Sequence, residues 1–105
     1  MESEKTTEAY LRDRVKALGG HSYKWVSPGC SGVPDRIVVR PDGGVFFVET
    51  KSEGETSTKQ QKRRQAELRE MGCRVYADID TKVKVDEMLR REFGGRKIGD
   101  GGVQE

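Results

Sequence analysis

Hydrophobic residues near the start of the chain follow the spacing of a helix. Leu11, Val15 and Leu18 recur every three or four positions within residues 3–18, and this spacing places them along one face of an α-helix. Gly19-Gly20 follows directly and is a typical helix end. The pattern therefore predicts a first helix whose apolar face packs on the rest of the chain.

Short runs of β-branched and aromatic residues predict the strands. These runs cover residues 21–26, 35–40, 45–51 and 74–79, and their composition is typical of strands in a partly buried sheet. The sequence Pro41-Asp42-Gly43-Gly44 has strong turn-forming chemistry. We therefore expect the strands on either side of it to form a hairpin.

Two further helices follow from capping and spacing. Thr58 and Gln61 match a capping box at the start of a second helix that Gly72 ends. Residues 82–93 predict a third helix, whose inward residues are Val85, Met88, Leu89 and Phe93. The order of elements predicts a small α/β domain over residues 1–93, with a mixed sheet flanked by helices. The Gly-rich polar segment 94–105 is expected to be a flexible tail.

Composition limits the size of the core. Of 105 residues, 32% are hydrophobic and 36% are charged, so a single domain with a thin core is expected, for which oligomerisation is one source of further burial. The net charge of +2 says little about partners. Five cations accompany only Glu67 in the second helix, and they are Lys59, Lys62, Arg63, Arg64 and Arg69. Such a run indicates either a solvated helix face or a phosphate-bearing partner.

The cysteines and the lack of long apolar runs indicate the compartment. Cys30 and Cys73 have no paired spacing, and with His21 they offer no zinc-binding motif. No run resembles a signal peptide or a membrane span. We therefore expect a cytoplasmic protein with two free thiols and no contact with a membrane.

The open end of the predicted hairpin carries three charged residues. Glu49 and Lys51 lie two positions apart and share one face of their strand. If Arg40 lies opposite Val45, then Asp35 lies opposite the residue between them. The hairpin therefore brings Asp35, Glu49 and Lys51 together, far from the turn.

This arrangement favours a metal site for phosphodiester hydrolysis. Two neighbouring carboxylates repel each other, and a divalent cation such as Mg²⁺ relieves that cost. Asp35, Glu49 and the backbone carbonyl of Thr50 supply suitable oxygens, and Lys51 is placed to orient or activate water beside the metal. The alternative is a surface salt bridge between Lys51 and either acid.

Two other polar residues point toward the same place. Glu8 extends the apolar face of the first helix and is a candidate further metal ligand; alternatively, it only complements the helix dipole. Gln61 shares the core-facing side of the second helix with Gln65 and Leu68. A buried amide needs a partner such as a carboxylate, although the capping box also accounts for Gln61.

The ordered set of these residues resembles the VRR-NUC (virus-type replication-repair nuclease) family of the PD-(D/E)xK superfamily, over about residues 6–80. The residues that carry the resemblance are Glu8, Gly19-Gly20, Lys24, Ser27-Pro28-Gly29, Gly32-Val33-Pro34-Asp35-Arg36, Phe47-Val48-Glu49-Thr50-Lys51, Gln61, Leu68 and Gly72. The resemblance implies a restriction-endonuclease-like core and a Mg²⁺- or Mn²⁺-dependent DNA endonuclease. It matches Asp35 and Glu49 to the metal-binding acids, Lys51 to the catalytic lysine, Glu8 to the acid of the first helix, and Gln61, or the adjacent Gln60, to the downstream glutamine.

The stand-alone phage and prophage members of that family imply further expectations. They suggest a homodimer that acts on branched DNA, such as four-way junctions, in repair or recombination. Phosphate contacts are expected from Lys24, Arg36, Lys59, Lys62, Arg63 and Arg64. No base-reading helix is evident, so selectivity for DNA structure is expected. A non-catalytic, basic nucleic-acid-binding module is the alternative, and an interaction protein using charged helices has no specific support.

Overall fold

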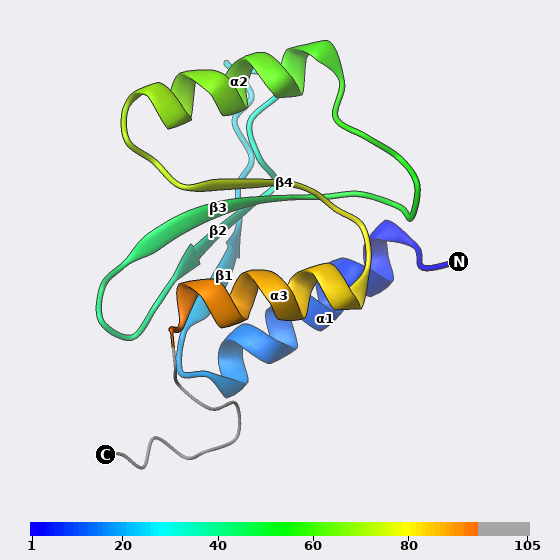
Figure 1. Ribbon diagram of the computed structural model, residues 1–105. Helices are drawn as coiled ribbons and strands as arrows, with labels where there is room; N and C mark the ends of the chain where they lie inside the picture. Colours follow the sequence, from blue (N-terminus) through cyan, green and yellow to red (C-terminus); the bar gives the residue numbers. More distant parts are fainter. Residues whose placement is uncertain (95–105) are drawn as a thin grey trace.

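Seven elements follow in the predicted order in a computed structural model that describes residues 1–94 (Figure 1). They are α1 (Glu4–Ala17), β1 (His21–Lys24), β2 (Arg36–Val39), β3 (Val45–Thr50), α2 (Lys59–Glu70), β4 (Val75–Ile79) and α3 (Lys82–Glu92). Ser3 caps α1 by accepting a hydrogen bond from the Thr6 amide. The expected tail lies outside the described residues, apart from Gly94. None of the described helices is long and apolar enough to cross a membrane.

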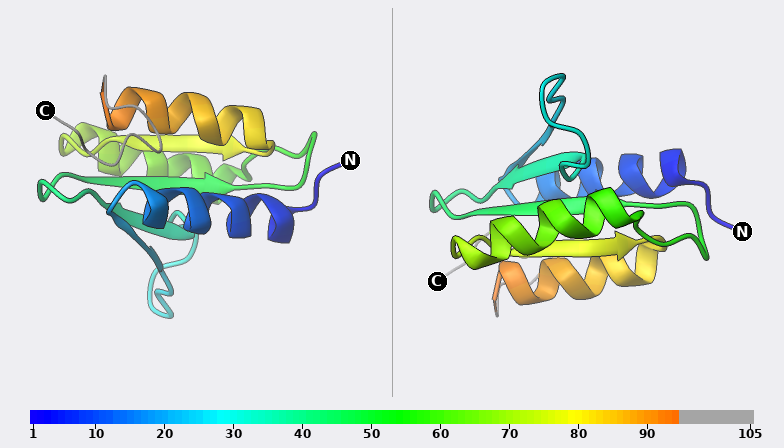
Figure 2. Two further views of the ribbon diagram at one scale, coloured as in Figure 1. Left: turned by 90° about the horizontal axis from the view of Figure 1, so that it is seen from below. Right: turned by 90° about the horizontal axis from the view of Figure 1, so that it is seen from above.

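The elements form three layers around one mixed sheet. The strand order is β1-β2-β3-β4, with antiparallel pairs at β1–β2 and β2–β3 and a parallel pair at β3–β4. Helices α1 and α3 lie side by side on one face, and α2 lies on the other (Figures 1 and 2). On its side α2 covers the β3–β4 half of the sheet (Figure 2). The mixed-sheet α/β class predicted from the sequence is confirmed.

The hydrophobic core lies between the sheet and the α1–α3 layer. Its fully buried members come from α1, the two central strands and α3, and include Leu11, Val15, Val38, Phe46, Val48, Val85 and Leu89. The opposite face is different, because Gln65 is the single buried residue of α2. Helix α2 therefore contributes no fully buried apolar residue, and hydrogen bonds from Gln61 to Glu49 and from Arg69 to the Val75 carbonyl connect it to the sheet.

The hairpin register differs by one residue from the sequence-based expectation. Val39, rather than Arg40, lies opposite Val45. The cause is the turn, which closes over three residues because Arg40 donates its amide to the Gly44 carbonyl at 2.7 Å. Gly43 has a φ of +91° and occupies the left-handed position that such three-residue turns require. The predicted turn was thus one residue too long.

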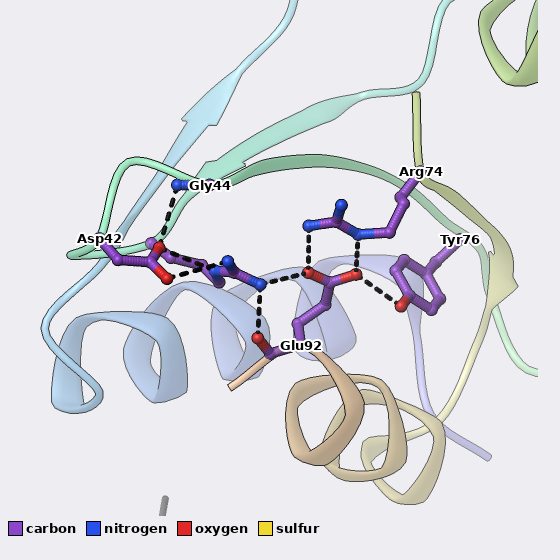
Figure 3. A network of polar contacts seen from close by, with 6 residues as sticks. Asp42, Gly44, Arg74, Tyr76 and Glu92 are labelled. Atoms are coloured by element: carbon purple, nitrogen blue, oxygen red, sulfur yellow. Dashed lines mark hydrogen bonds and ion pairs between the residues drawn. The ribbon is translucent and has the colours of Figure 1, made fainter. Parts of the chain in front are cut away.

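A buried ion network holds the turn end of the sheet together (Figure 3). The Glu92 carboxylate is 2% exposed and accepts two hydrogen bonds from Arg74 and one from the Tyr76 hydroxyl. Arg40 donates to the Glu92 side chain and to its backbone carbonyl, and also pairs with Asp42 in the turn. The network therefore joins the β2–β3 turn, β4 and the end of α3.

Replacing Glu92 by Gln should lower stability in a pH-dependent way. Burial alone would raise the pKa of Glu92, but the hydrogen bonds from Arg74 and Tyr76 outweigh burial and lower it below 4.5. The stabilisation is therefore present above about pH 4.5 and is lost as the pH falls further. We expect Glu92→Gln to lower the free energy of unfolding at pH 7 by about 2 kcal/mol, measured by denaturant titration. An equal loss at pH 3 would contradict this account.

Candidate active site

The charged end of the hairpin lies at the opposite end of β3 from the turn. Asp35 directly precedes β2, and its carboxylate accepts hydrogen bonds from the Thr50 amide at 2.8 Å and the Thr50 hydroxyl at 2.5 Å. Glu49 and Lys51 flank Thr50 at the end of β3. The predicted association of Asp35, Glu49 and Lys51 therefore survives the register correction.

The amide of Gln61 connects the lysine and the buried acid. Gln61 Oε1 accepts a hydrogen bond from Lys51 Nζ at 2.8 Å, and Gln61 Nε2 donates to Glu49 Oε2 at 3.0 Å. Lys51 Nζ also lies 3.9 Å from Glu49 Oε2. The carboxylate and the ammonium group are thus held side by side by one side chain from α2.

Gln61 has both of the roles that the sequence suggested. The capping box is present, because Gln61 Oε1 also accepts from the Thr58 amide at 2.9 Å and Thr58 Oγ1 accepts from the Gln61 amide. The neighbouring Gln60 instead donates to Ser31 Oγ at 2.8 Å. Of the two glutamines, Gln61 is therefore the one that contacts Lys51 and Glu49, and the start of α2 is coupled to the position of Lys51.

Glu49 is a buried carboxylate with an unsatisfied oxygen. Its side chain is 4% exposed, and its Oε1 has no hydrogen-bond partner within residues 1–94. Burial, followed by repulsion from Asp35, raises the pKa of Glu49 to about 8 despite the nearby Lys51. Burial likewise raises the pKa of Asp35, against the two hydrogen bonds from Thr50. This is a costly arrangement for a purely structural pair of acids.

Glu8 and Arg36 pair with each other at the edge of the site. Glu8 lies on the inward face of α1 as predicted, and its Oε2 accepts from Arg36 Nε at 2.8 Å. Arg36 was expected on the DNA-binding surface, but it is 7% exposed and also donates to the Ser22 carbonyl at 3.4 Å. A buried, paired guanidinium does not fit an exposed phosphate ligand, so we correct that placement.

The other basic residues that were predicted to contact phosphates divide into two groups. Four are exposed, and they are Lys24, Lys59, Lys62 and Arg63. Arg64 is instead half-buried, donates to the Ser31 carbonyl at 2.9 Å and pairs with Glu67. Together with the Gln60–Ser31 bond, it fastens the β1–β2 loop to α2. Gly32 is needed at this contact, because its φ is +86° and a Cβ would lie 2.8 Å from Gln60.

Comparison with known proteins identifies the family. The VRR-NUC domain family matches residues 3–77, which is most of the chain. The chain belongs to the VRR-NUC family. A protein of Acyrthosiphon pisum secondary endosymbiont phage 1, named "Putative nuclease p44", is 46% identical over 72 residues, covering 69% of this chain and 77% of the relative. A solved VRR-NUC domain is 31% identical, with a TM-score of 0.78 and coverage of 86% of this chain and 97% of that structure.

Membership in the VRR-NUC family makes the chain a nuclease. Many nucleases use a divalent metal ion, and the acids of this site can be compared with what such an ion requires. Within residues 1–94, no three His, Cys, Asp or Glu side chains are already arranged around one point. The free Oε1 of Glu49 beside Asp35 is nevertheless suited to a divalent cation, and the Asp35 oxygens keep lone pairs beyond those that bond Thr50. The residues therefore fit such an ion, with ligation by Asp35, Glu49 and the Thr50 carbonyl as a prediction.

Sequence reasoning missed one acid of this VRR-NUC site. Glu4 lies in the first turn of α1, one turn before Glu8. Burial, then repulsion from Asp35 and Glu8, raises the pKa of Glu4, whereas Lys51 lowers it. Extending the inward stripe of α1 by one further helical step from Glu8 reaches Glu4, so the signal was available.

A strained backbone position supports the start of α2. Asp78 lies at an irregularity in the β3–β4 pairing and has a φ of +57°, which Asp tolerates better than most residues. Its Oδ1 accepts from both the amide and the hydroxyl of Ser57 at 2.7 Å. Gln65 Nε2 in turn donates to Ser57 Oγ. This chain of contacts positions the segment that leads to Gln61.

Replacing Glu49 by Gln should stabilise the metal-free protein. Because the folded state keeps a proton that the unfolded state loses, the free energy of unfolding falls as the pH rises from 4.5 to about 8. Glu49→Gln removes that loss, and we expect a gain on the order of 2 kcal/mol at pH 8, since each pKa unit corresponds to about 1.4 kcal/mol and buried sites relax. Denaturant titration in EDTA from pH 5 to pH 9 measures it. The control is Glu87→Gln on the exposed side of α3, and a Glu49→Gln protein with the same pH profile as wild type would refute the argument.

Comparison of Gln61→Ala with Thr58→Ala should separate the two roles of Gln61. Both changes remove the helix cap and should cost about 1 kcal/mol of stability. Only Gln61→Ala releases Lys51 and Glu49, so its nuclease activity should fall by roughly tenfold or more because the reacting groups lose their positions. Thr58→Ala should cleave DNA almost as well as wild type. Equal losses of activity in the two variants would show that helix capping alone matters.

Proposed function

We propose that this VRR-NUC protein is a DNA endonuclease that depends on Mg²⁺ or Mn²⁺. The observation that carries the proposal is the buried, unpartnered Oε1 of Glu49 next to Asp35, with Lys51 fixed beside them by Gln61. A purely structural group of charges would be fully paired. The alternative of a non-catalytic binding module gives no reason for this arrangement.

The side chains have distinct parts in phosphodiester hydrolysis. A divalent ion bound by Asp35, Glu49 and the Thr50 carbonyl would act as a Lewis acid and lower the pKa of bound water. Lys51 would place its ammonium group where negative charge develops on the phosphate. Gln61 keeps the Lys51 ammonium in position, because Gln61 Oε1 accepts a hydrogen bond from Lys51 Nζ at 2.8 Å. Thr50 keeps the Asp35 carboxylate in one orientation through two hydrogen bonds.

We also propose that the enzyme selects branched DNA, such as four-way junctions, by structure. The exposed cations Lys59, Lys62 and Arg63 lie on α2, the helix that supplies Gln61, and Lys24 lies at the end of β1 nearest the site. Such residues contact phosphates and carry no sequence information by themselves. The phage origin of the relative fits a role in phage or prophage replication or recombination in the cytoplasm of a bacterial host.

A homodimer is the second part of this proposal. Helix α2 covers the β3–β4 half of the sheet (Figure 2). Elsewhere in the sheet of the described chain, Tyr23 of β1 and Val45 at the start of β3 are 53% and 41% exposed. Strand β1 is an edge strand, and exposed apolar surface beside a sheet edge favours association. Sedimentation analysis of the purified protein measures the number of chains.

Replacing Asp35 by Asn should abolish cleavage while folding and DNA affinity stay near those of wild type. Linear, forked and four-way DNA are incubated with wild type and Asp35→Asn across Mg²⁺ and Mn²⁺ titrations, with EDTA as the metal-free condition. The matched control is Asp13→Asn on the exposed side of α1, which should cleave normally. Cleavage by Asp35→Asn at the wild-type rate would refute the metal site, and equal cleavage of linear and four-way DNA would refute the structural selectivity.

A further inference from the structure

Four carboxylates and two cations gather at the active-site end of the sheet. The acids are Glu4, Glu8, Asp35 and Glu49, and the cations are Arg36 and Lys51. Carboxylates outnumber cations in this group, and Glu55 and Asp78 add further negative charge near Glu4 and Glu49, so the excess has the sign that a divalent ion neutralises. Arg36 limits this excess, because without it the group would have one more uncompensated negative charge.

The contacts of Arg36 show what its charge compensates. Its Nε donates to Glu8 Oε2 at 2.8 Å, and the two side chains are 9% and 17% exposed. Its Nη1 donates to the Ser22 carbonyl in β1, which fixes the guanidinium to the sheet. The Glu8 carboxylate is therefore engaged by the guanidinium of Arg36.

Resting on the proposed metal dependence, we propose that Arg36 is a positioning residue that takes the place of a second metal ion. It neutralises Glu8, so that Glu8 needs no second divalent ion beside the one held by Asp35 and Glu49. In two-metal nuclease sites, two ions about 3.5–4 Å apart share neighbouring carboxylates. The Arg36 guanidinium is held against Glu8 and the Ser22 carbonyl, so it supplies the second positive charge from a fixed place. The burial of Arg36, which argues against a contact with DNA, is compatible with this role.

A mutant cycle between Glu8 and Arg36 tests this role without DNA. Calorimetric titration of Mn²⁺ into the whole chain gives stoichiometry and affinity for wild type, Arg36→Met, Arg36→Lys, Glu8→Gln and the double variant Glu8→Gln/Arg36→Met. Thermal unfolding in EDTA checks that each variant folds. The double variant keeps the cycle informative if Arg36→Met alone is unstable, because removing both members of a pair is far less disruptive than removing one.

The expected results follow from the charge balance. Wild type and Arg36→Lys should bind one ion with affinities within about threefold of each other, because the positive charge is kept. Arg36→Met should bind a second ion or bind Mn²⁺ about tenfold more tightly, a gain of about 1.4 kcal/mol. Glu8→Gln should bind several-fold more weakly, because Arg36 is then unpaired. The double variant should return to wild-type binding, since the lost pair is neutral.

Three results would overturn the proposal. One is binding of two ions by wild type. Another is a double variant that binds Mn²⁺ more than about tenfold more weakly than wild type, which would make Glu8 itself a metal ligand. The third is Arg36→Met with unchanged metal binding and a lowered melting temperature, as a merely structural role predicts. Failure of the proposed function is distinguishable, because wild type would then bind no Mn²⁺ or Asp35→Asn would bind it unchanged.

Discussion

Hydrogen bonds from the start of α2 set the geometry of the candidate site, and the proposed chemistry depends on them. Gln65 is the one residue of α2 that is buried, whereas the core on the other face is formed by apolar residues from α1 and α3. Hydrogen bonds are directional, so they fix distances more narrowly than apolar packing does. Gln61 uses this property twice, because one amide both caps the helix and spaces Lys51 from Glu49. Folding of the helix end and assembly of the site are therefore one event.

Burying the incompletely paired carboxylate of Glu49 costs free energy, which the rest of the fold must offset. Glu49 is buried without a full set of partners, and it faces repulsion from Asp35. By contrast, Glu92 at the other end of the sheet is equally buried but bonded by Arg74, Tyr76 and Arg40. The same residue type is thus stabilising where its charge is satisfied and destabilising where it is left open. Local conflicts of this kind are typical of functional sites in otherwise consistent folds.

Much of the fold and part of the site were predictable from the sequence, for identifiable reasons. Helical and alternating spacing determined the order of the elements, and the capping box marked the start of α2 correctly. The hairpin register was wrong because the left-handed Gly43 shortens the turn by a residue, which composition does not reveal. Arg36 was placed on the surface because a lone arginine in a strand gives no sign of its buried partner. Glu8 points inward, as the apolar stripe of α1 predicted, yet only three-dimensional contacts show that it meets Arg36.

The Glu92 network has a practical consequence for observing the enzyme. It anchors the end of α3 beside the β2–β3 turn, at the end of the sheet remote from Asp35 and Lys51. The exposed residues Arg90 and Arg91 lie on this part of α3. A fluorescent reporter or a surface tether attached there would leave the end of the molecule that carries Asp35 and Lys51 unobstructed, which suits the chain to single-molecule recording of nuclease activity.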